Sequence, residues 1–276
     1  MAEHRGTMQA DERARLAVLD TMAGQPVLWN DYVLKGGLAL YYAYESPRRS
    51  YDLDFTSLTT FKKKKAPETD ELLRAFCPVL DEGLAESAAK HGFHLLQSCW
   101  QRLSEQMPIL YVRVGYVEDA AERDLCRRYV EMQVTLSEVV CEARTAHRSG
   151  VPVHVPSLED VLAEKLKALL QQVTRGIHRP QDLFDVWYYT LARPQPVDAD
   201  KVTRFLLAKT AQWPEVQPVT RARFQDLRLL ERASTGYAQM AADLAPGVRL
   251  PPPSEAYAAL LRFADRLDLP VGFSNG

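Results

Sequence analysis

The chain has 276 residues, 46% of them hydrophobic, which is enough to bury the core of one large domain or of two smaller ones. Its 34 Lys and Arg residues against 36 Asp and Glu give a formal net charge of −2. This balance excludes attraction by the whole molecule as a basis for nucleic-acid binding, so any such contact needs a local basic patch. The N-terminus is polar and no run of about 18 apolar residues occurs, so we expect a cytoplasmic protein with no membrane span.

The four cysteines, Cys77, Cys99, Cys126 and Cys141, show no C-x-x-C spacing. No pair of histidines stands near them at a metal-ligand interval. We interpret them as buried thiols in a reducing cytoplasm.

In the first half of the chain, the apolar spacing predicts a helix over residues 10–22, ended by a turn at 24–26. A short helix over 38–45 and a strand around 52–55 follow, and then a long amphipathic helix over 70–90. Blocks rich in Val, Tyr and Leu at 94–100, 109–116 and 129–136 predict the strands of a mixed sheet.

The second half is expected to be mainly helical. An apolar segment at 151–155 precedes Ser157, and Asp160 three residues later indicates the start of a helix. Helices are predicted over residues 158–172, 181–191, 198–211, 221–230 and 254–267. The expected fold class is α+β, with a mixed sheet and flanking helices in residues 1–155 and a helical domain in residues 156–276.

A glycine pair and two aspartates in the first half form the first candidate site. Gly36 and Gly37 can turn tightly at the start of a helix, where backbone N–H groups can bind phosphates. Asp52 and Asp54 then point to the same side of a strand, because side chains alternate, while Leu53 faces the core. Two carboxylates on one face can share divalent metal ions in a phosphoryl transfer. Each pattern alone is common in turns and exposed strands, and only their combination indicates this chemistry.

A second candidate cluster lies on the predicted C-terminal helices. Lys165 is on the first of them, and Asp182 and Asp185 follow three residues apart on one helix face. A lysine facing a cleft can neutralise a triphosphate or pyrophosphate, and an acidic partner can orient it. The alternative is that these are solvated residues of an amphipathic helix.

Together, the two clusters resemble those of the AbiEii/MenT-type nucleotidyltransferase toxins, of the DNA polymerase β-like nucleotidyltransferase superfamily. The resemblance covers residues 30 to 190, and the remaining residues match only in being helical. It rests on residues 35–40 (KGGLAL), 48–54 (RRSYDLD), 164–169 (EKLKAL) and 179–185 (RPQDLFD).

The resemblance implies a role for each candidate. Asp52 and Asp54 would bind Mg2+ or Mn2+, the turn at Gly36 and Gly37 would bind the triphosphate of an NTP, and Lys165 would complete the site with Asp182 or Asp185. Further nucleotide contacts are expected from Arg49 and Ser50.

Two positions depart from the family's pattern or match it weakly. The superfamily commonly has a third metal-binding carboxylate, for which Glu131 is the candidate; the alternative is a solvent-facing glutamate on an edge strand. Leu38 stands where the family often has Thr or Ser, so backbone donors or Ser50 would have to replace the missing hydroxyl.

Basic residues flank the aspartates, and an RNA backbone could bind to them. The four lysines 62–65 form the densest run, which a solvated loop explains equally well. Other members of such a patch would be Arg48, Arg49, Arg127, Arg128, Arg175 and Arg179, with His178 as a weaker candidate.

The resemblance further implies a toxin of a toxin–antitoxin system that transfers a nucleoside monophosphate to the 3′ end of tRNA and arrests translation. The antitoxin would be encoded separately. Two alternatives remain open: the acceptor could be a protein or a small molecule, or the fold could be an inactive binding module. The presence of both Asp52 and Asp54 argues against the last, because a module without catalysis has no reason to hold two like charges side by side without a cation.

Overall fold

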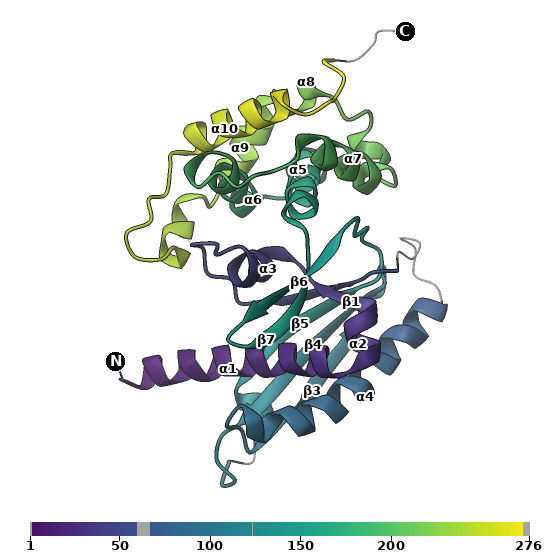
Figure 1. Ribbon diagram of the computed structural model, residues 1–276, viewed down its shortest axis with the longest axis vertical. Helices are drawn as coiled ribbons and strands as arrows, with labels where there is room; N and C mark the ends of the chain where they lie inside the picture. Colours follow the sequence, from purple (N-terminus) through teal and green to yellow (C-terminus); the bar gives the residue numbers. More distant parts are fainter. Residues whose placement is uncertain (1, 60–66, 123, 273–276) are drawn as a thin grey trace. The chain divides into compact units, whose positions relative to one another are not determined.

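The structure is a computed structural model in which residues 2–59, 67–122 and 124–272 are described (Figure 1). The chain separates into two compact units. The first, which we call the sheet unit, contains the residues up to Glu45 and Ser50–Pro156. The second, the helical unit, contains Ser46–Arg49 and the residues from Ser157 onward.

The sheet unit holds four helices, a short 3-10 helix and seven strands among the residues described. The helices are α1 (Ala2–Gly24), α2 (Pro26–Asp31), α3 (Gly36–Ala43), α4 (Pro67–Lys90) and the 3-10 helix η1 (Leu125–Arg127). The strands are β1 (Tyr32–Leu34), β2 (Leu53–Ser57), β3 (Leu95–Leu103), β4 (Ile109–Val117), β5 (Tyr129–Thr135), β6 (Ala143–Arg148) and β7 (Val151–Pro156).

Five of the strands form one mixed sheet in the order β1-β2-β5-β4-β3, and β6 pairs with β7 in a separate hairpin. β2 and β5 run parallel, while the other neighbouring strands are antiparallel. The expected α+β class with a mixed sheet is confirmed. β5 is the central strand, so Glu131 does not lie on an edge strand.

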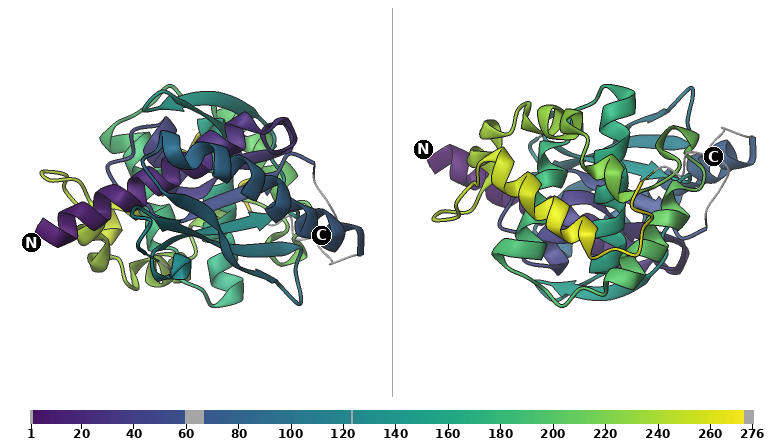
Figure 2. Two further views of the ribbon diagram at one scale, coloured as in Figure 1. Left: turned by 90° about the horizontal axis from the view of Figure 1, so that it is seen from below. Right: turned by 90° about the horizontal axis from the view of Figure 1, so that it is seen from above.

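Helices α1 and α4 pack against each other and against one face of the sheet (Figures 1 and 2). On β2, Leu53 and Phe55 are buried in this core, as the alternation predicted, and Met132 and Val134 of β5 join them. Since neighbouring residues of a strand point to opposite faces, the residues between them face away from α1 and α4.

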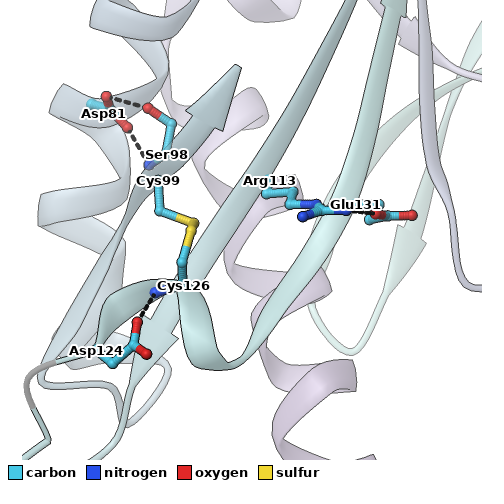
Figure 3. The surroundings of a disulfide bond; sticks show 7 residues. All are labelled: Asp81, Ser98, Cys99, Arg113, Asp124, Cys126 and Glu131. Carbon is cyan, nitrogen blue, oxygen red and sulfur yellow. Dashed lines mark hydrogen bonds and ion pairs between the residues drawn. A yellow bond between two sulfur atoms is a disulfide. The ribbon is translucent and has the colours of Figure 1, made fainter. Parts of the chain in front are cut away.

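A β-bulge in β3 changes which side chains face the helices. The register shifts by one residue between Ser98, which pairs with Val114, and Trp100, which pairs with Arg113. Ser98 donates its N–H and hydroxyl to Asp81 of α4 at 2.7 and 2.6 Å, so it faces the helices (Figure 3). Cys99 is the extra residue, and Trp100 therefore faces the opposite side of the sheet.

The interpretation of all four cysteines as buried thiols is wrong for two of them. Cys99 and Cys126 form a disulfide, which joins the bulge in β3 to η1 (Figure 3). η1 comes close because Gly115 has no side chain: a Cβ there would lie 2.3 Å from the carbonyl oxygen of Leu125. Spacing along the chain did not indicate this pair, since the bulge and the close crossing bring it together. Cys77 is a buried thiol and Cys141 a half-buried one.

The helical unit is built around α5 (Leu158–Arg175), which packs against α6, α7 and α9. Ser157 caps α5 by accepting the N–H of Asp160, as predicted. The last helix, α10, lies over α6, α8 and α9 (yellow in Figure 2, right). The remaining elements are α6 (Pro180–Trp187), the π-helix η2 (Tyr188–Ala192), α7 (Ala199–Thr210), η3 (Pro214–Val216), α8 (Arg221–Phe224), α9 (Leu227–Ser234), η4 (Ala238–Asp243) and α10 (Pro253–Asp265).

Residues Ser46–Arg49 belong to the helical unit although the sheet unit flanks them in sequence. Their backbone bonds to the end of η4 and the segment after it: Arg49 donates to the Asp243 carbonyl, and Ala245 donates to the Pro47 carbonyl, both at 2.8 Å. In the described part of the chain, no helix is both long and apolar enough to cross a membrane.

Candidate active site

The turn between β1 and α3 lies against Asp54. Lys35 donates its backbone N–H to the Asp54 carbonyl at 2.7 Å, and α3 begins at the next residue. Gly36 has a φ of +72°, and a Cβ there would lie 3.1 Å from Oδ2 of Asp54. The glycine pair starts a helix, as the sequence predicted, with Gly37 as the second residue of that helix. The start of this helix lies beside the Asp54 carboxylate, and its binding of a triphosphate stays a prediction.

Asp52 and Asp54 line one cavity of about 350 Å³ on the face of the sheet away from α1 and α4. Asp52 is exposed and Asp54 is half-buried. Glu131 and Gln133 of β5 line the same cavity, because β5 pairs directly with β2 and Gln133 is the register partner of Asp54. The structure thus brings together the three carboxylates that the sequence analysis selected in this half of the chain.

The Glu131 carboxylate bonds to Arg113 of β4, as Figure 3 shows. The distance from both Nε and a terminal nitrogen of Arg113 is 3.2 Å, and the Glu131 side chain is 57% exposed. The Arg113 guanidinium also lies 5.1 Å from the ring centroid of Trp100 and 4.4 Å from that of Tyr129. Arg113 is therefore positioned by aromatic rings and orients Glu131.

The cluster predicted on the C-terminal helices is present within the helical unit. Lys165 of α5 is buried, with its Nζ 2.8 Å from Asp182 and 2.7 Å from Asp185. Asp185 is also bonded to Arg48, at 3.3 Å from Nε and 3.0 Å from a terminal nitrogen. The interpretation of these residues as solvated surface is wrong, since two cations and two carboxylates form a nearly enclosed network.

Burial and charge act in opposite directions on the pKa values of this network. Burial raises the pKa of Asp185, but Arg48 and Lys165 outweigh it and hold this pKa below its ordinary value. Burial lowers the pKa of Lys165, but Asp182 and Asp185 outweigh it and hold this pKa above its ordinary value. Both groups are therefore charged at neutral pH, and the network is close to neutral as a whole.

Of the remaining predicted residues, Arg49 and Ser50 lie outside these two clusters, and Arg48 belongs to the second. Arg49 is exposed in the helical unit, and Ser50 is half-buried at the point where the chain re-enters the sheet unit. Arg48 is buried against Asp185, so it is not part of an exposed basic patch. The lysine run 62–65 falls outside the described residues.

The aromatic and arginine residues that line the cavity were missed by the sequence analysis: Trp100, Arg102, Tyr111 and Arg113. A signal for them was present, because an aromatic and an arginine stand two apart in both Trp100-x-Arg102 and Tyr111-x-Arg113, and residues two apart share a strand face.

A helix that begins with a glycine pair lies beside β2, and Asp54 of β2 and the preceding Asp52 line one cavity, an arrangement that fits a nucleotidyltransferase. The family model described as nucleotidyl transferase AbiEii toxin, type IV toxin–antitoxin system, matches residues 18–261. The chain belongs to this family, as its motifs suggested, and it is a nucleotidyltransferase.

One of the similar solved structures, MenT4, supports the fold. MenT4, a nucleotidyltransferase toxin from Mycobacterium tuberculosis, superposes with a TM-score of 0.57 at 17% identity, covering 93% of this chain and 85% of MenT4. A proposed nucleotidyltransferase from Helicobacter pylori gives a TM-score of 0.49 at 15% identity, covering 93% and 92%. No curated protein sequence matches the chain.

Proposed function

We propose that this nucleotidyltransferase toxin transfers a nucleoside monophosphate from an NTP to the 3′ end of tRNA, in a reaction that requires Mg2+ or Mn2+. The modified tRNA would then fail in translation. The observation that carries the proposal is the pair of aspartates at one cavity, with the α3 turn against Asp54. Membership of a type IV toxin–antitoxin family implies an antitoxin as partner.

The donor atoms at the cavity suit such a cation. Mg2+ is usually held by one or two carboxylates, with water and substrate phosphates completing its ligands. Asp52 and Asp54 supply two carboxylates, and among the described residues no group of three or more His, Cys, Asp and Glu side chains is placed to hold a metal. The pair fits a cation shared with a phosphate better than one enclosed by protein. When bound, the metal would supply charge stabilisation for the transferring phosphate.

The residues of the sheet unit would position both substrates. The N-terminus of α3, with its free backbone N–H groups at Gly36 and Gly37, would bind the triphosphate. The acceptor oxygen bonds to the α-phosphorus while the bond to the leaving pyrophosphate breaks, and the hydroxyl proton passes to solvent. Arg49 and Ser50 would add nucleotide contacts, and Glu131, oriented by Arg113, would be a third carboxylate at the same cavity.

In the helical unit, we assign different roles to the two aspartates. The Asp182 side chain is 14% exposed and that of Asp185 is fully buried. Asp182 with Lys165 would therefore interact with the substrate, whereas Asp185 would position Lys165 and bind Arg48.

The test is transfer of label from each α-labelled NTP in turn to total tRNA, with and without Mg2+. Wild type should label tRNA only with the metal, and Asp52→Ala should lower the rate at least about a hundredfold, because it removes a preorganised charge at the reacting phosphate. Asp31→Ala is the control: Asp31 is exposed in the same unit and is not part of the cavity. A rate for Asp52→Ala equal to that of wild type would refute the mechanism.

Other outcomes identify the alternatives. Label in protein or in a small molecule, with none in tRNA, would move the acceptor to that class. No transfer to any acceptor, together with no Mg2+-dependent NTP binding, would favour an inactive binding module.

A further inference from the structure

A row of two aromatic residues and two arginines lies at the β3 and β4 side of the cavity. Trp100 pairs across the strands with Arg113, and Arg102 pairs with Tyr111. In each pair the arginine lies over the ring: the distances from guanidinium carbon to ring centroid are 5.1 Å for Arg113 on Trp100 and 5.1 Å for Arg102 on Tyr111. All four line the cavity that holds the aspartate pair. We call them the aromatic–arginine row.

The β3 bulge is what creates this row. Without the extra residue Cys99, Trp100 would lie on the same face of the sheet as Ser98 and would point toward α4 instead of the cavity. The bulge is held from both sides, by Asp81 on the helix face and by the disulfide to Cys126 (Figure 3). Trp100 is nevertheless 41% exposed, so a large apolar ring in a fixed position faces solvent beside the candidate active site.

The two members of the row on β3, Trp100 and Arg102, are too far from the aspartates to contact the reacting atoms. The sheet order places β5 and β4 between β2 and β3, and three steps of about 4.8 Å between strands give roughly 14 Å. The turn assigned to the triphosphate is on the β2 side, at Asp54. A substrate that reaches both the aspartates and the row must therefore extend across the sheet face.

We propose that the aromatic–arginine row binds unpaired nucleotides of the acceptor RNA, next to the one that carries the reacting hydroxyl. Unpaired bases stack on aromatic rings and on planar guanidinium groups, and arginines also bind phosphates. The row supplies both in one place, on a chain whose net charge of −2 gives no general attraction for RNA. A paired duplex cannot present its base faces in this way. This inference rests on the proposed function, because it identifies part of that reaction's acceptor site.

The first test measures binding without catalysis. The full-length protein is titrated into a fluorescently labelled short single-stranded RNA in EDTA, and anisotropy gives the affinity. Trp100→Ala should weaken binding about tenfold, Trp100→Phe should keep most of it because a ring remains, and Arg102→Gln should weaken binding and reduce its salt dependence. Fully paired RNA should bind more weakly than the single strand.

The matched control is Leu95→Ala. Leu95 is also on β3 and 40% exposed, and it is not among the residues that line the cavity. Its replacement should leave RNA affinity unchanged. An equal loss in Leu95→Ala and Trp100→Ala, or wild-type affinity in both Trp100→Ala and Arg102→Gln, would overturn the inference. So would a preference for acidic peptide over RNA.

The second test measures transfer to tRNA with the same variants. Trp100→Ala should raise the KM for tRNA about tenfold while kcat and the KM for NTP stay near the wild-type values, because Trp100, on the strand farthest from the aspartates, contacts only the acceptor. If wild type labels tRNA and Trp100→Ala alters neither KM nor affinity, the inference fails and the proposed function stands. If wild type transfers nothing to RNA but binds single strands through Trp100, the proposed acceptor fails and the row remains an RNA-binding site.

Discussion

At Gly36 the backbone approaches the Asp54 carboxylate closely enough that no other residue fits unchanged. A Cβ would lie 3.1 Å from Oδ2 of Asp54, and the φ of +72° is one that residues with side chains rarely adopt. The carboxylate belongs to the pair assigned to the metal. A side chain at this position would therefore act on catalysis by moving a carboxylate as well as on stability by straining the backbone.

We expect Gly36→Ala to lower the transfer rate by about 10- to 100-fold, because small displacements of a positioned group have effects of this size. The free energy of unfolding should fall by about 1 kcal/mol from the strained φ alone. Initial rates of label transfer and urea unfolding followed by circular dichroism measure the two effects.

Gly92→Ala tests backbone strain alone, without displacement of a carboxylate. Gly92, also in the sheet unit, has a φ of +76°, and a Cβ there would meet nothing within 4 Å. This variant should lose similar stability and keep wild-type transfer. Equal transfer rates in the two variants would show that Gly36 has no special relation to Asp54.

Among the elements, α6 is joined to the segment Ser46–Arg49 by a buried ion pair. Arg48 and Asp185 are both almost completely buried, and Lys165 binds the same carboxylate. Removing one member of such a network leaves uncompensated charge in the interior, which typically costs about 3–5 kcal/mol. The cluster that the sequence suggested for catalysis thus also stabilises the helical unit.

This ion pair predicts a specific pH dependence of stability. The pKa of Asp185 is lowered on folding, so its contribution is complete above the unfolded value of about 3.9 and is lost as the pH falls through the lower folded pKa. Asp185→Asn should lower the free energy of unfolding by about 3–5 kcal/mol at neutral pH. The difference from wild type should shrink in strong acid, as measured by urea unfolding at several pH values.

Glu255→Gln serves as the control in the same unit. Glu255 pairs with Arg249, whose side chain is 64% exposed, and such surface pairs contribute about 1 kcal/mol or less. This variant should unfold close to wild type at every pH. An Asp185→Asn protein with wild-type stability at neutral pH would show that the buried pair does not stabilise the fold.

The sequence predicted elements where local pattern decides the structure. Alternation along β2 placed Leu53 in the core and Asp54 on the opposite face, and Ser157 marked the start of α5. Features that depend on segments distant in sequence were not predictable. They are the register shift of β3 against β4 that turns Trp100, the disulfide of Cys99 with Cys126, and the burial of Arg48 against Asp185.

Strand β6 (Ala143–Arg148) was missed because its residues are mostly polar and it pairs only with β7. Whether the candidate residues act in transfer stays a prediction.

At the scale of the whole molecule, the chain passes between its two units three times. It enters the helical unit at Ser46, returns at Ser50 and enters again at Ser157. A domain of residues 156–276, as the sequence suggested, would lack Ser46–Arg49, which bond to the end of η4 and the segment after it and supply Arg48 to Asp185. The division at residues 155 and 156 stays a prediction, and the connectivity argues against independent folding of residues 156–276.

We expect a fragment of residues 157–276 to be less stable than the same unit in the full chain by about 3–5 kcal/mol, since Asp185 loses one of its two cations. A synthetic peptide of residues 44–51 should raise the melting temperature of the fragment, measured by circular dichroism, as a ligand that binds only the folded state does. The same peptide with Arg48→Met should raise it less. A fragment that melts as the full-length helical unit does, and ignores both peptides, would establish residues 156–276 as an autonomous domain. Arg48 would then contribute little to its stability.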